Sequence, residues 1–204
     1  MAIMRWILCA AIGYLLGNIQ TGLLVARLSG EDLRKHGSGS SGATNALRVL
    51  GRRSAIITFV GDLLKGVIAS AIGIFIAGTV GGMFACVFVV VGHIWPVFFG
   101  FKGGKGAATS IGALFVILPV QTLVMLVVGV AVVFITKMVS LGSIVGALTL
   151  LLIESVSSII SFDPAQLIFI VIMVALIVYA HRENIDRIRK GTENKISGDM
   201  FRKR

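Results

Sequence analysis

Long apolar stretches separated by short polar segments form the main pattern of this chain. They occupy residues 6–28, 54–77, 83–99, 107–136, 141–160 and 167–180. A helix needs about 20 apolar residues to cross a hydrocarbon core about 30 Å thick, and none of the stretches shows the alternation typical of a membrane β-strand. The pattern therefore predicts an all-α membrane protein.

The stretch 107–136 decides the number of crossings. Basic residues gather in two segments, six in 27–53 and eight in 182–204, and such segments face the cytoplasm. Both basic segments lie on the cytoplasmic side if residues 78–82 form an outer turn and the stretch 107–136 crosses the membrane twice, with a break near Pro119. Lys102, Lys105 and Lys137 then lie on that side as well. We therefore expect about seven transmembrane helices, with the N-terminus outside and the C-terminus in the cytoplasm. Thirty helical residues measure only about 45 Å, which is short for two full crossings. The alternative is a re-entrant pair of helices, which enters and leaves the membrane on the same side and gives the same orientation for the rest of the chain.

Composition excludes an ordinary soluble domain, because only 14% of the residues are charged and the mean hydropathy is +0.98. The formal net charge is +10, but the basic residues flank apolar stretches, so we interpret them as topology signals and expect no nucleic-acid partner. Cys9 and Cys86 lie inside apolar stretches and predict neither a disulfide framework nor a metal site. Gly142 and Gly146 form a GxxxG pattern that indicates helix packing.

We expect a single domain over residues 1–204, because no linker or repeat divides the chain. A cleaved signal peptide is the alternative for the first apolar stretch. That stretch is too long for one and lacks a clear small-residue cleavage site.

The first cluster of polar residues precedes the second apolar stretch. It consists of Gly37, Ser38, Gly39, Ser40, Ser41, Gly42, Ala43, Thr44 and Asn45, followed by Arg48. Glycines and small hydroxyls let backbone N–H groups approach an anion. A flexible linker is the alternative, but Arg48 favours a phosphate site because a guanidinium binds phosphate through two N–H groups. The Walker pattern GxxxxGK[ST] is absent from the sequence.

A second cluster precedes the stretch 107–136 and consists of Gly100, Phe101, Lys102, Gly103, Gly104, Lys105 and Gly106. A cytoplasmic anchor would explain the two lysines but not the four glycines. We therefore expect a second phosphate site here. His93 is a weaker signal, since a lone histidine at a helix end also serves to hydrogen-bond inside a bundle.

Charged side chains inside the apolar stretches are a third feature. Asp62 and Lys65 are three residues apart and are followed by Gly66. Intramembrane charges are costly and indicate function, whereas an internal ion pair would only stabilise the bundle. We expect this pair to shape the site rather than react, and we assign Glu154 no role because it lies farther from the cytoplasmic face.

The last cluster begins where the final apolar stretch ends. It runs through His181, Arg182, Glu183, Asn184, Ile185 and Asp186, with Arg187, Arg189, Gly191, Glu193 and Lys195 after it. His181 and Asn184 share a helix face, where an imidazole and an amide can orient a hydroxyl substrate or supply a general base. For the residues after Gly191 we favour a basic tail that binds anionic lipid.

Taken together, the three clusters resemble the cytoplasmic motifs of a known family. The bacterial acyl-phosphate:glycerol-3-phosphate acyltransferases of the PlsY type carry similar motifs in the same order. The resemblance extends over nearly the whole chain, including Asp62, Lys65, Gly66, residues 93–99 and the seven-span plan.

The resemblance implies transfer of a fatty acyl group from acyl phosphate to the 1-hydroxyl of glycerol 3-phosphate. The products would be lysophosphatidic acid and phosphate, in the first acylation step of bacterial phospholipid synthesis. The catalytic set that binds glycerol 3-phosphate would be Ser38, Arg48, Lys105, His181 and Asn184. The other substrate-binding residues would be Gly39, Ser40, Gly42, Thr44, Asn45, Lys102, Gly103 and Gly104, with the acyl phosphate at the loop through Gly42, Thr44 and Asn45. Asp62, Lys65 and His93 would support the site.

The same resemblance implies no cofactor, no metal and no acyl-enzyme. It also implies an active site on the cytoplasmic side of the bacterial inner membrane and no obligatory protein partner. The sequence departs from the family pattern at two positions, with Ser40 in place of the usual Asn and Gln20 near a usual Pro. We expect Ser40 to affect the acyl-phosphate pocket and Gln20 to matter less.

Three alternatives use the same residues. His181 and Asp186 have the H-x4-D spacing of another acyltransferase class, but that class has a large soluble catalytic domain that this chain cannot form. A transporter of a phosphorylated anion would need charges along its path, and only Asp62, Lys65, Glu154 and Asp163 interrupt the apolar stretches or their outer ends. A structural membrane subunit would leave the glycine and lysine loops unexplained.

Overall fold

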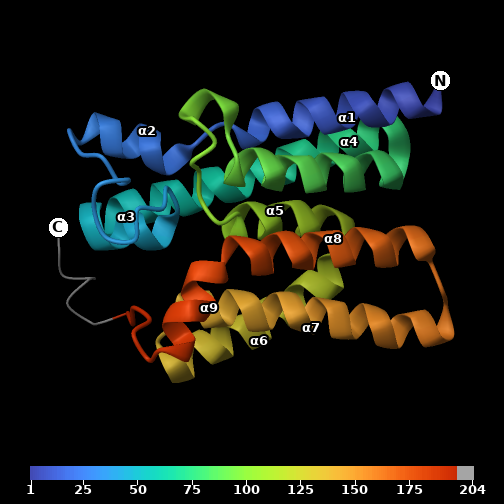
Figure 1. Ribbon diagram of the computed structural model, residues 1–204. Coiled ribbons are helices and arrows are strands. Elements are labelled where there is room, and N and C mark those ends of the chain that lie inside the picture. Colours follow the sequence, from blue (N-terminus) through green and yellow to red (C-terminus); the bar gives the residue numbers. More distant parts are fainter. Residues whose placement is uncertain (197–204) are drawn as a thin grey trace.

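The computed structural model describes residues 1–196, and every regular element in that range is a helix (Figure 1). The elements are α1 (Ala2–Gly17), α2 (Thr21–Leu28), α3 (Ala43–Leu50), α4 (Arg52–Ile94), the short 3-10 helix η1 (Val97–Phe99), α5 (Ala107–Ile117), α6 (Pro119–Thr136), α7 (Val139–Ile160), α8 (Pro164–Ala180) and α9 (Arg182–Arg189). The prediction of an all-α fold is confirmed.

Helix α4 is a hairpin of two arms rather than one rod. Its helical geometry breaks at Ala77 and Gly78, and Gly78 has a φ of 65°, a conformation that favours glycine. The two arms then pack closely, because a Cβ on either Gly73 or Gly81 would collide with the backbone oxygen of the other. The turn therefore lies at the beginning of the predicted segment 78–82, and helix resumes within that segment.

The stretch 107–136 breaks at the expected proline. Leu118 leaves helical geometry and Pro119 begins α6, where its fixed φ suits the first helical position. Lys105 before α5 and Ser140 after α6 line the same pocket, so the chain enters and returns at one end of the molecule. With 11 residues, α5 measures only about 17 Å and is too short to cross a bilayer alone.

The helices have the length and composition of a multi-pass membrane protein. Within residues 1–196, four helical segments are long and apolar enough to cross a membrane, and the bent pair of α8 and α9 would make a fifth. These four segments are Ala2–Leu28, Arg52–Phe99, Pro119–Thr136 and Val139–Ile160. The second segment, Arg52–Phe99, contains both arms of the α4 hairpin, so the number of long helical arms is larger than the number of segments.

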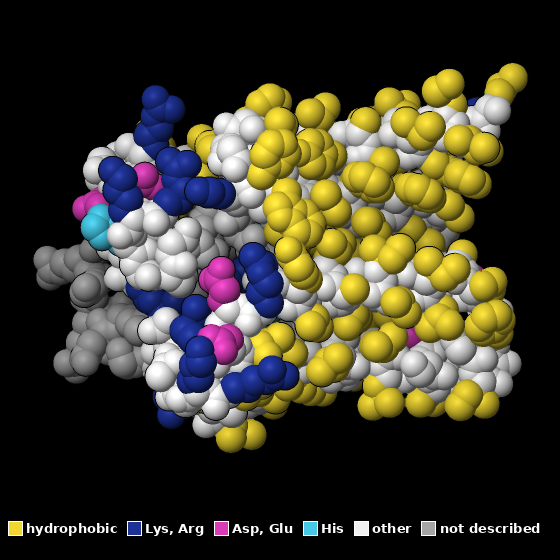
Figure 2. Space-filling model, viewed as in Figure 1, with side chains coloured by type: hydrophobic (Ala, Val, Ile, Leu, Met, Phe, Trp, Pro, Cys, Tyr) yellow, Lys and Arg dark blue, Asp and Glu magenta, His cyan; other side chains and the backbone are white. Residues whose placement is uncertain are grey.

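Charged and apolar side chains separate along the long axis of the molecule. Figure 2 shows most lysines, arginines and acidic residues at one end, around α2, α3 and α9, while hydrophobic side chains cover the rest of this face. Phe75 and Phe134 are among the large apolar residues that are mostly exposed, as expected for side chains in contact with lipid. The charged end is therefore the part of the molecule built to meet water.

Close helix packing explains the GxxxG pattern. Backbone atoms of Gly129 in α6 lie against Gly142 and Gly146 in α7, so small residues let these helices approach. Cys9 and Cys86 are both buried free thiols that form no disulfide with each other.

Candidate active site

A polar pocket of about 180 Å³ lies among side chains of the charged end of the bundle. Side chains from all three sequence clusters line it. From the predicted set it contains Ser38, Ser40, Gly42, Thr44, Asn45, Arg48, Asp62, His93, Lys105, His181 and Asn184. Segments that are more than 130 residues apart in the sequence therefore meet in one place.

Asn45 holds the first loop in shape. Its side chain is 1% exposed, and its Nδ2 donates to backbone oxygens of Leu33, His36 and Ser40 at 2.9–3.1 Å. Its Oδ1 accepts from the backbone N–H of Ser38 at 2.9 Å. The amide group is thus occupied by the loop itself, and Asn45 presents Ser38 to the pocket rather than a free polar atom.

The pocket is cationic. Arg48, Lys105 and Arg187 all line it, and the buried Nε of Arg48 has no hydrogen-bond partner within residues 1–196. Burial, aided by the nearby charges of Arg187 and Arg48, lowers the pKa of Lys105 to about 8. An unpartnered guanidinium N–H and clustered positive charges are the features that bind a phosphate group.

Glu193 is a pocket residue that the sequence pattern did not reveal. Its side chain is only 4% exposed and accepts hydrogen bonds from Ser140 Oγ at 2.8 Å, Asn184 Nδ2 at 2.7 Å and Arg187 Nε at 2.8 Å. Burial alone would raise the pKa of Glu193, but these three hydrogen bonds lower it. Nothing in the sequence distinguishes this glutamate from the other charges of a surface tail.

The interpretation of the residues after Gly191 as a lipid-binding tail is therefore wrong for Glu193. The chain folds back over α9, where Thr192 N donates to Arg187 O, and Ile196 N donates to Lys137 O at 2.8 Å. A buried carboxylate with three donors is stable there, whereas it would be repelled by anionic lipid. Lys195 is exposed, and residues 197–204 lie outside the described part of the chain.

Asn184 connects Glu193 to the second cluster. Its Oδ1 accepts from Lys105 Nζ while its Nδ2 donates to Glu193. Helix α9 is bent by 58° from α8, and this bend turns the buried Asn184 towards the pocket. The amide therefore fixes the Lys105 ammonium at the pocket wall.

His181 lies at the bend between α8 and α9 and is 3% exposed. Its Nδ1 lies 2.8 Å from the carbonyl oxygen of Ile177. Because a carbonyl oxygen only accepts, Nδ1 carries the proton, which leaves Nε2 as an acceptor in the neutral ring. Asp186 pairs instead with Lys190 on the surface, at 2.8 Å, so the H-x4-D spacing builds no His–Asp pair.

Several predicted residues lie outside the pocket wall. Gly39 and Lys102 are exposed, and Gly103, Gly104 and Lys65 do not line the cavity. Glu154 is also remote, buried in α7, where it accepts a hydrogen bond from Gln166 Nε2 at 2.9 Å.

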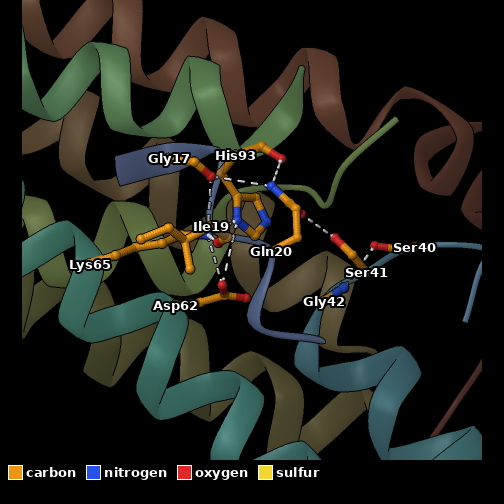
Figure 3. A network of polar contacts seen from close by, with 9 residues as sticks. All are labelled: Gly17, Ile19, Gln20, Ser40, Ser41, Gly42, Asp62, Lys65 and His93. Atoms are coloured by element: carbon orange, nitrogen blue, oxygen red, sulfur yellow. Dashed lines mark hydrogen bonds and ion pairs between the residues drawn. The ribbon is translucent and has the colours of Figure 1, made fainter. Parts of the chain in front are cut away.

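At the pocket wall, Asp62 and His93 form one buried network with Lys65, which lies behind them (Figure 3). Lys65 Nζ lies 2.9 Å from Asp62 Oδ1 and 2.7 Å from His93 Nδ1, and donates to Ile19 O at 2.5 Å. All three charged or polar side chains are at most 4% exposed. The geometry is that of an internal ion pair that joins the end of α1, through Gly17 O at 3.4 Å, and the segment after it to both arms of α4.

An apolar cavity of about 220 Å³ adjoins the polar pocket. It lies among α5, α6, α7 and α8, and its wall includes Leu114, Met125, Ala147 and Met173. Both cavities share Phe59, Ala107, Ile111, Val139 and Ser143 as lining residues. A molecule with a polar head and an apolar chain fits this arrangement.

Comparison with known proteins agrees with this chemistry. The family model described as glycerol-3-phosphate acyltransferase matches residues 7–191. The chain belongs to the glycerol-3-phosphate acyltransferase family. This membership confirms the resemblance recognised in the motifs.

Relatives in the glycerol-3-phosphate acyltransferase family match the chain along almost its whole length. The glycerol-3-phosphate acyltransferase of Clostridioides difficile strain 630 is 47% identical over 203 residues, covering 96% of this chain and 98% of that protein. That of Thermoanaerobacter pseudethanolicus is 44% identical and covers 93% and 95%.

Solved structures show the same fold. The crystal structure of PlsY (YgiH), an integral membrane glycerol 3-phosphate acyltransferase, in its glycerol 3-phosphate form superposes with a TM-score of 0.87 at 37% identity, covering 94% of this chain and 96% of that one. Its lysophosphatidic acid form gives a TM-score of 0.85 at 36% identity, covering 96% of this chain and 97% of that one.

Proposed function

We propose that this chain transfers a fatty acyl group from acyl phosphate to the 1-hydroxyl of glycerol 3-phosphate. One observation carries the proposal: a cationic pocket built from three distant motifs adjoins an apolar cavity and shares five lining residues with it. Both substrates carry a phosphate and one carries a long chain, so this junction suits the pair. Family membership supports the same activity, and the whole chain would act as one membrane domain.

The cationic residues would hold the phosphates. Arg48 lines the pocket and its Nε has no partner among residues 1–196. Lys105 is held at the wall by Asn184, so glycerol 3-phosphate would bind there together with Ser38. The loop through Gly42 and Thr44 would receive the acyl phosphate. The remaining predicted residues outside the wall, Gly39, Lys102, Gly103 and Gly104, would act through loop shape or added positive field.

The apolar cavity would hold the acyl chain. Its boundary with the polar pocket, at Phe59 and Val139, would then place the acyl carbonyl carbon next to the phosphate-binding groups. Burial of each methylene favours binding by about 0.8 kcal/mol, so this cavity supplies the affinity for the chain while the pocket supplies orientation.

The chemistry needs no covalent enzyme intermediate. The 1-hydroxyl oxygen attacks the acyl carbon, the bond between that carbon and the phosphate oxygen breaks, and phosphate leaves. The hydroxyl proton passes to the leaving phosphate, while His181 orients the bound glycerol 3-phosphate without taking that proton. Acyl phosphate is a mixed anhydride, so positioning and stabilisation of developing negative charge suffice.

His181→Ala tests this role. We expect turnover to fall together with weaker binding of glycerol 3-phosphate, because an orienting group acts on the bound acceptor. Loss of turnover with unchanged binding of labelled glycerol 3-phosphate would instead make His181 a catalytic base.

The proposed function includes a membrane orientation. The two arms of α4 count as separate crossings and α5 with α6 as a short pair, which gives seven spans with the N-terminus outside and the pocket in the cytoplasm. Cys9 and Cys86 are buried, so single cysteines introduced at exposed Lys35 and Thr79 give a clean test. A membrane-impermeant maleimide should label the Lys35→Cys variant only from inside and Thr79→Cys only from outside.

A two-donor assay tests the activity itself. Purified protein in lipid is given labelled glycerol 3-phosphate with either palmitoyl phosphate or palmitoyl-CoA, with EDTA present. We expect lysophosphatidic acid from palmitoyl phosphate alone. Product from the CoA donor alone would contradict the donor assignment, and no product together with uptake of glycerol 3-phosphate into liposomes would indicate a transporter.

A further inference from the structure

A buried glutamine lies between the two glycine-rich loops of the site. Gln20 stands in the break between α1 and α2 and is 0% exposed. Figure 3 shows its amide pointing between Ser41 on one side and His93 on the other. A buried amide is stable only when its polar atoms are paired, so these partners fix the orientation of the side chain.

The oxygen of this amide holds the first loop. Ser41 Oγ donates to Gln20 Oε1 at 2.7 Å, and Ser41 is itself 2% exposed. Ser41 follows the loop 37–40 and precedes α3, which carries Arg48. Gln20 therefore fixes the Ser41 side chain, next to the Ser40 backbone oxygen that Asn45 holds.

The nitrogen of the same amide reaches the second loop. Gln20 Nε2 donates to the backbone oxygen of His93 at 3.1 Å, and that oxygen also accepts from Gly104 N at 3.1 Å. Gly104 immediately precedes Lys105. A continuous path thus runs from Ser41 through Gln20 and His93 to Gly104.

The two loops also touch at the end of this path. A Cβ placed on Gly104 would lie 3.0 Å from Ser41 Oγ and would collide with the His93 ring. Only a residue without a side chain fits at position 104. A shift of the Ser41 side chain towards Gly104 would therefore displace the loop that carries Lys105.

We propose that Gln20 is a positioning residue for acyl transfer, which holds the loop before α3 and the Lys105 loop in register. The inference rests on the proposed function, in which the first loop receives the acyl phosphate and Lys105 holds glycerol 3-phosphate. Each phosphate can still bind when the register is lost, but the two reacting atoms no longer align. Misalignment of that kind lowers kcat more than it raises either KM.

Two substitutions separate positioning from stability. Gln20→Met keeps the length of the side chain and removes its polar atoms. In this variant the backbone oxygen of His93 still accepts from Gly104 N. The backbone oxygen of Gly17 also loses a donor, since it accepts from Gln20 Nε2 at 3.2 Å. It still accepts from Lys65 Nζ at 3.4 Å. Of these groups, only the Ser41 hydroxyl is left without a partner.

Ser41→Ala creates the opposite defect, because it leaves Gln20 Oε1 buried without a donor. An unsatisfied buried group destabilises more than the loss of both partners. The Gln20→Met/Ser41→Ala double variant should therefore unfold at a higher temperature than Ser41→Ala alone. If Gln20 positions the loops, the activity of the double variant should not recover with its stability.

The experiment measures kcat, both KM values and thermal unfolding for the wild type, the two single variants and the double variant. We expect kcat to fall about tenfold in all three variants, with each KM changed less than about twofold. Recovery of kcat in the double variant, an unchanged kcat in Gln20→Met, or a rise in one KM alone would each overturn the proposal.

Thr122→Val provides the matched control. Thr122 is 0% exposed in α6, donates to Leu118 O at 2.7 Å and lines neither cavity, so its substitution removes a buried hydroxyl away from the site. It should lower the unfolding temperature and leave kcat within about twofold. A wild-type protein without acyl-phosphate activity would overturn the proposed function and with it this inference, whereas an active wild type with unaffected Gln20→Met would overturn the inference alone.

Discussion

Removal of the Glu193 carboxylate is the most direct test of how the site is held together. Its two oxygens accept from Ser140, Asn184 and Arg187 at 2.7–2.8 Å, and Asn184 in turn holds Lys105. Glu193→Ala therefore leaves three donors unpaired, two on the buried Ser140 and Asn184 and one on the partly exposed Arg187. Hydrogen bonds to charged groups contribute about 1.5–3 kcal/mol each, and water can reach the Arg187 guanidinium, so its loss costs less than the about 3–5 kcal/mol of a fully buried ion pair.

We take about 3 kcal/mol as the loss in Glu193→Ala, because the three bonds share one carboxylate and their energies do not add. At 1.4 kcal/mol per factor of ten, this corresponds to a loss of about a hundredfold in kcat/KM if the whole cost falls on the arrangement of the pocket. Glu193→Gln keeps one acceptor oxygen but turns an NH2 group towards the donors, so we expect an intermediate loss.

The assay combines acyl transfer from palmitoyl phosphate with thermal unfolding in detergent. Glu183→Gln is the control, because Glu183 lies on the exposed side of α9 and its substitution removes the same charge from the same region. We expect the control to stay within about twofold of the wild type. Equal activity and unfolding temperature in Glu193→Ala, Glu183→Gln and the wild type would refute the reasoning.

Acidic pH should reproduce the effect of Glu193→Ala. The hydrogen bonds lower the pKa of Glu193 in the folded protein, so its stabilising contribution is present above the usual glutamate pKa of about 4.3 and is lost as pH falls through the lower, folded value. The acid-induced fall in unfolding temperature should therefore be smaller in Glu193→Ala than in the wild type. Equal falls in both proteins would contradict the ion-pair assignment.

Three further predictions concern the pocket and the cavity. Because Lys105 has a pKa of about 8 and binds phosphate only when protonated, kcat/KM for glycerol 3-phosphate should decline above about pH 8, and a pH profile of Lys105→Arg should show that decline at higher pH. Arg48→Lys should raise KM for glycerol 3-phosphate about tenfold in steady-state assays, since an ammonium lacks the planar pair of donors. Ala147→Leu fills the apolar cavity and should lower the ratio of kcat/KM for palmitoyl phosphate to that for lauroyl phosphate. The expected decrease is about fourfold for each methylene that no longer fits. The control is Leu148→Phe on the exposed face of α7, which should leave this ratio unchanged.

The local features of the fold were predictable because each depends on neighbouring residues. Apolar runs predicted the helices, and Pro119 predicted the break between α5 and α6. The internal ion pair of Asp62 and Lys65 followed from their spacing on one helix. In contrast, the hairpin turn at Gly78 was placed only approximately, since several small residues there tolerate a turn.

Motif chemistry identified much of the site, but not the role of every residue in it. Arg48, Lys105 and His181 were predicted from residue type and from resemblance, and all three line the pocket. Asn45 has the same kind of signal in the sequence but uses its amide to hold its own loop. Gln20 was expected to matter less than Ser40, and it lies in the contact between two loops, a position that no local pattern encodes.

The sequence alone determined that the protein is helical, lies in a membrane and carries motifs typical of phosphate binding, because hydrophobic length, charge bias and residue type act locally along the chain. Only the tertiary structure decided which of those motifs share one pocket and which residues hold them there. Glu193 shows the reason: its ionisation and burial depend on donors from α7 and α9, and contacts between distant segments become visible only when the chain is folded.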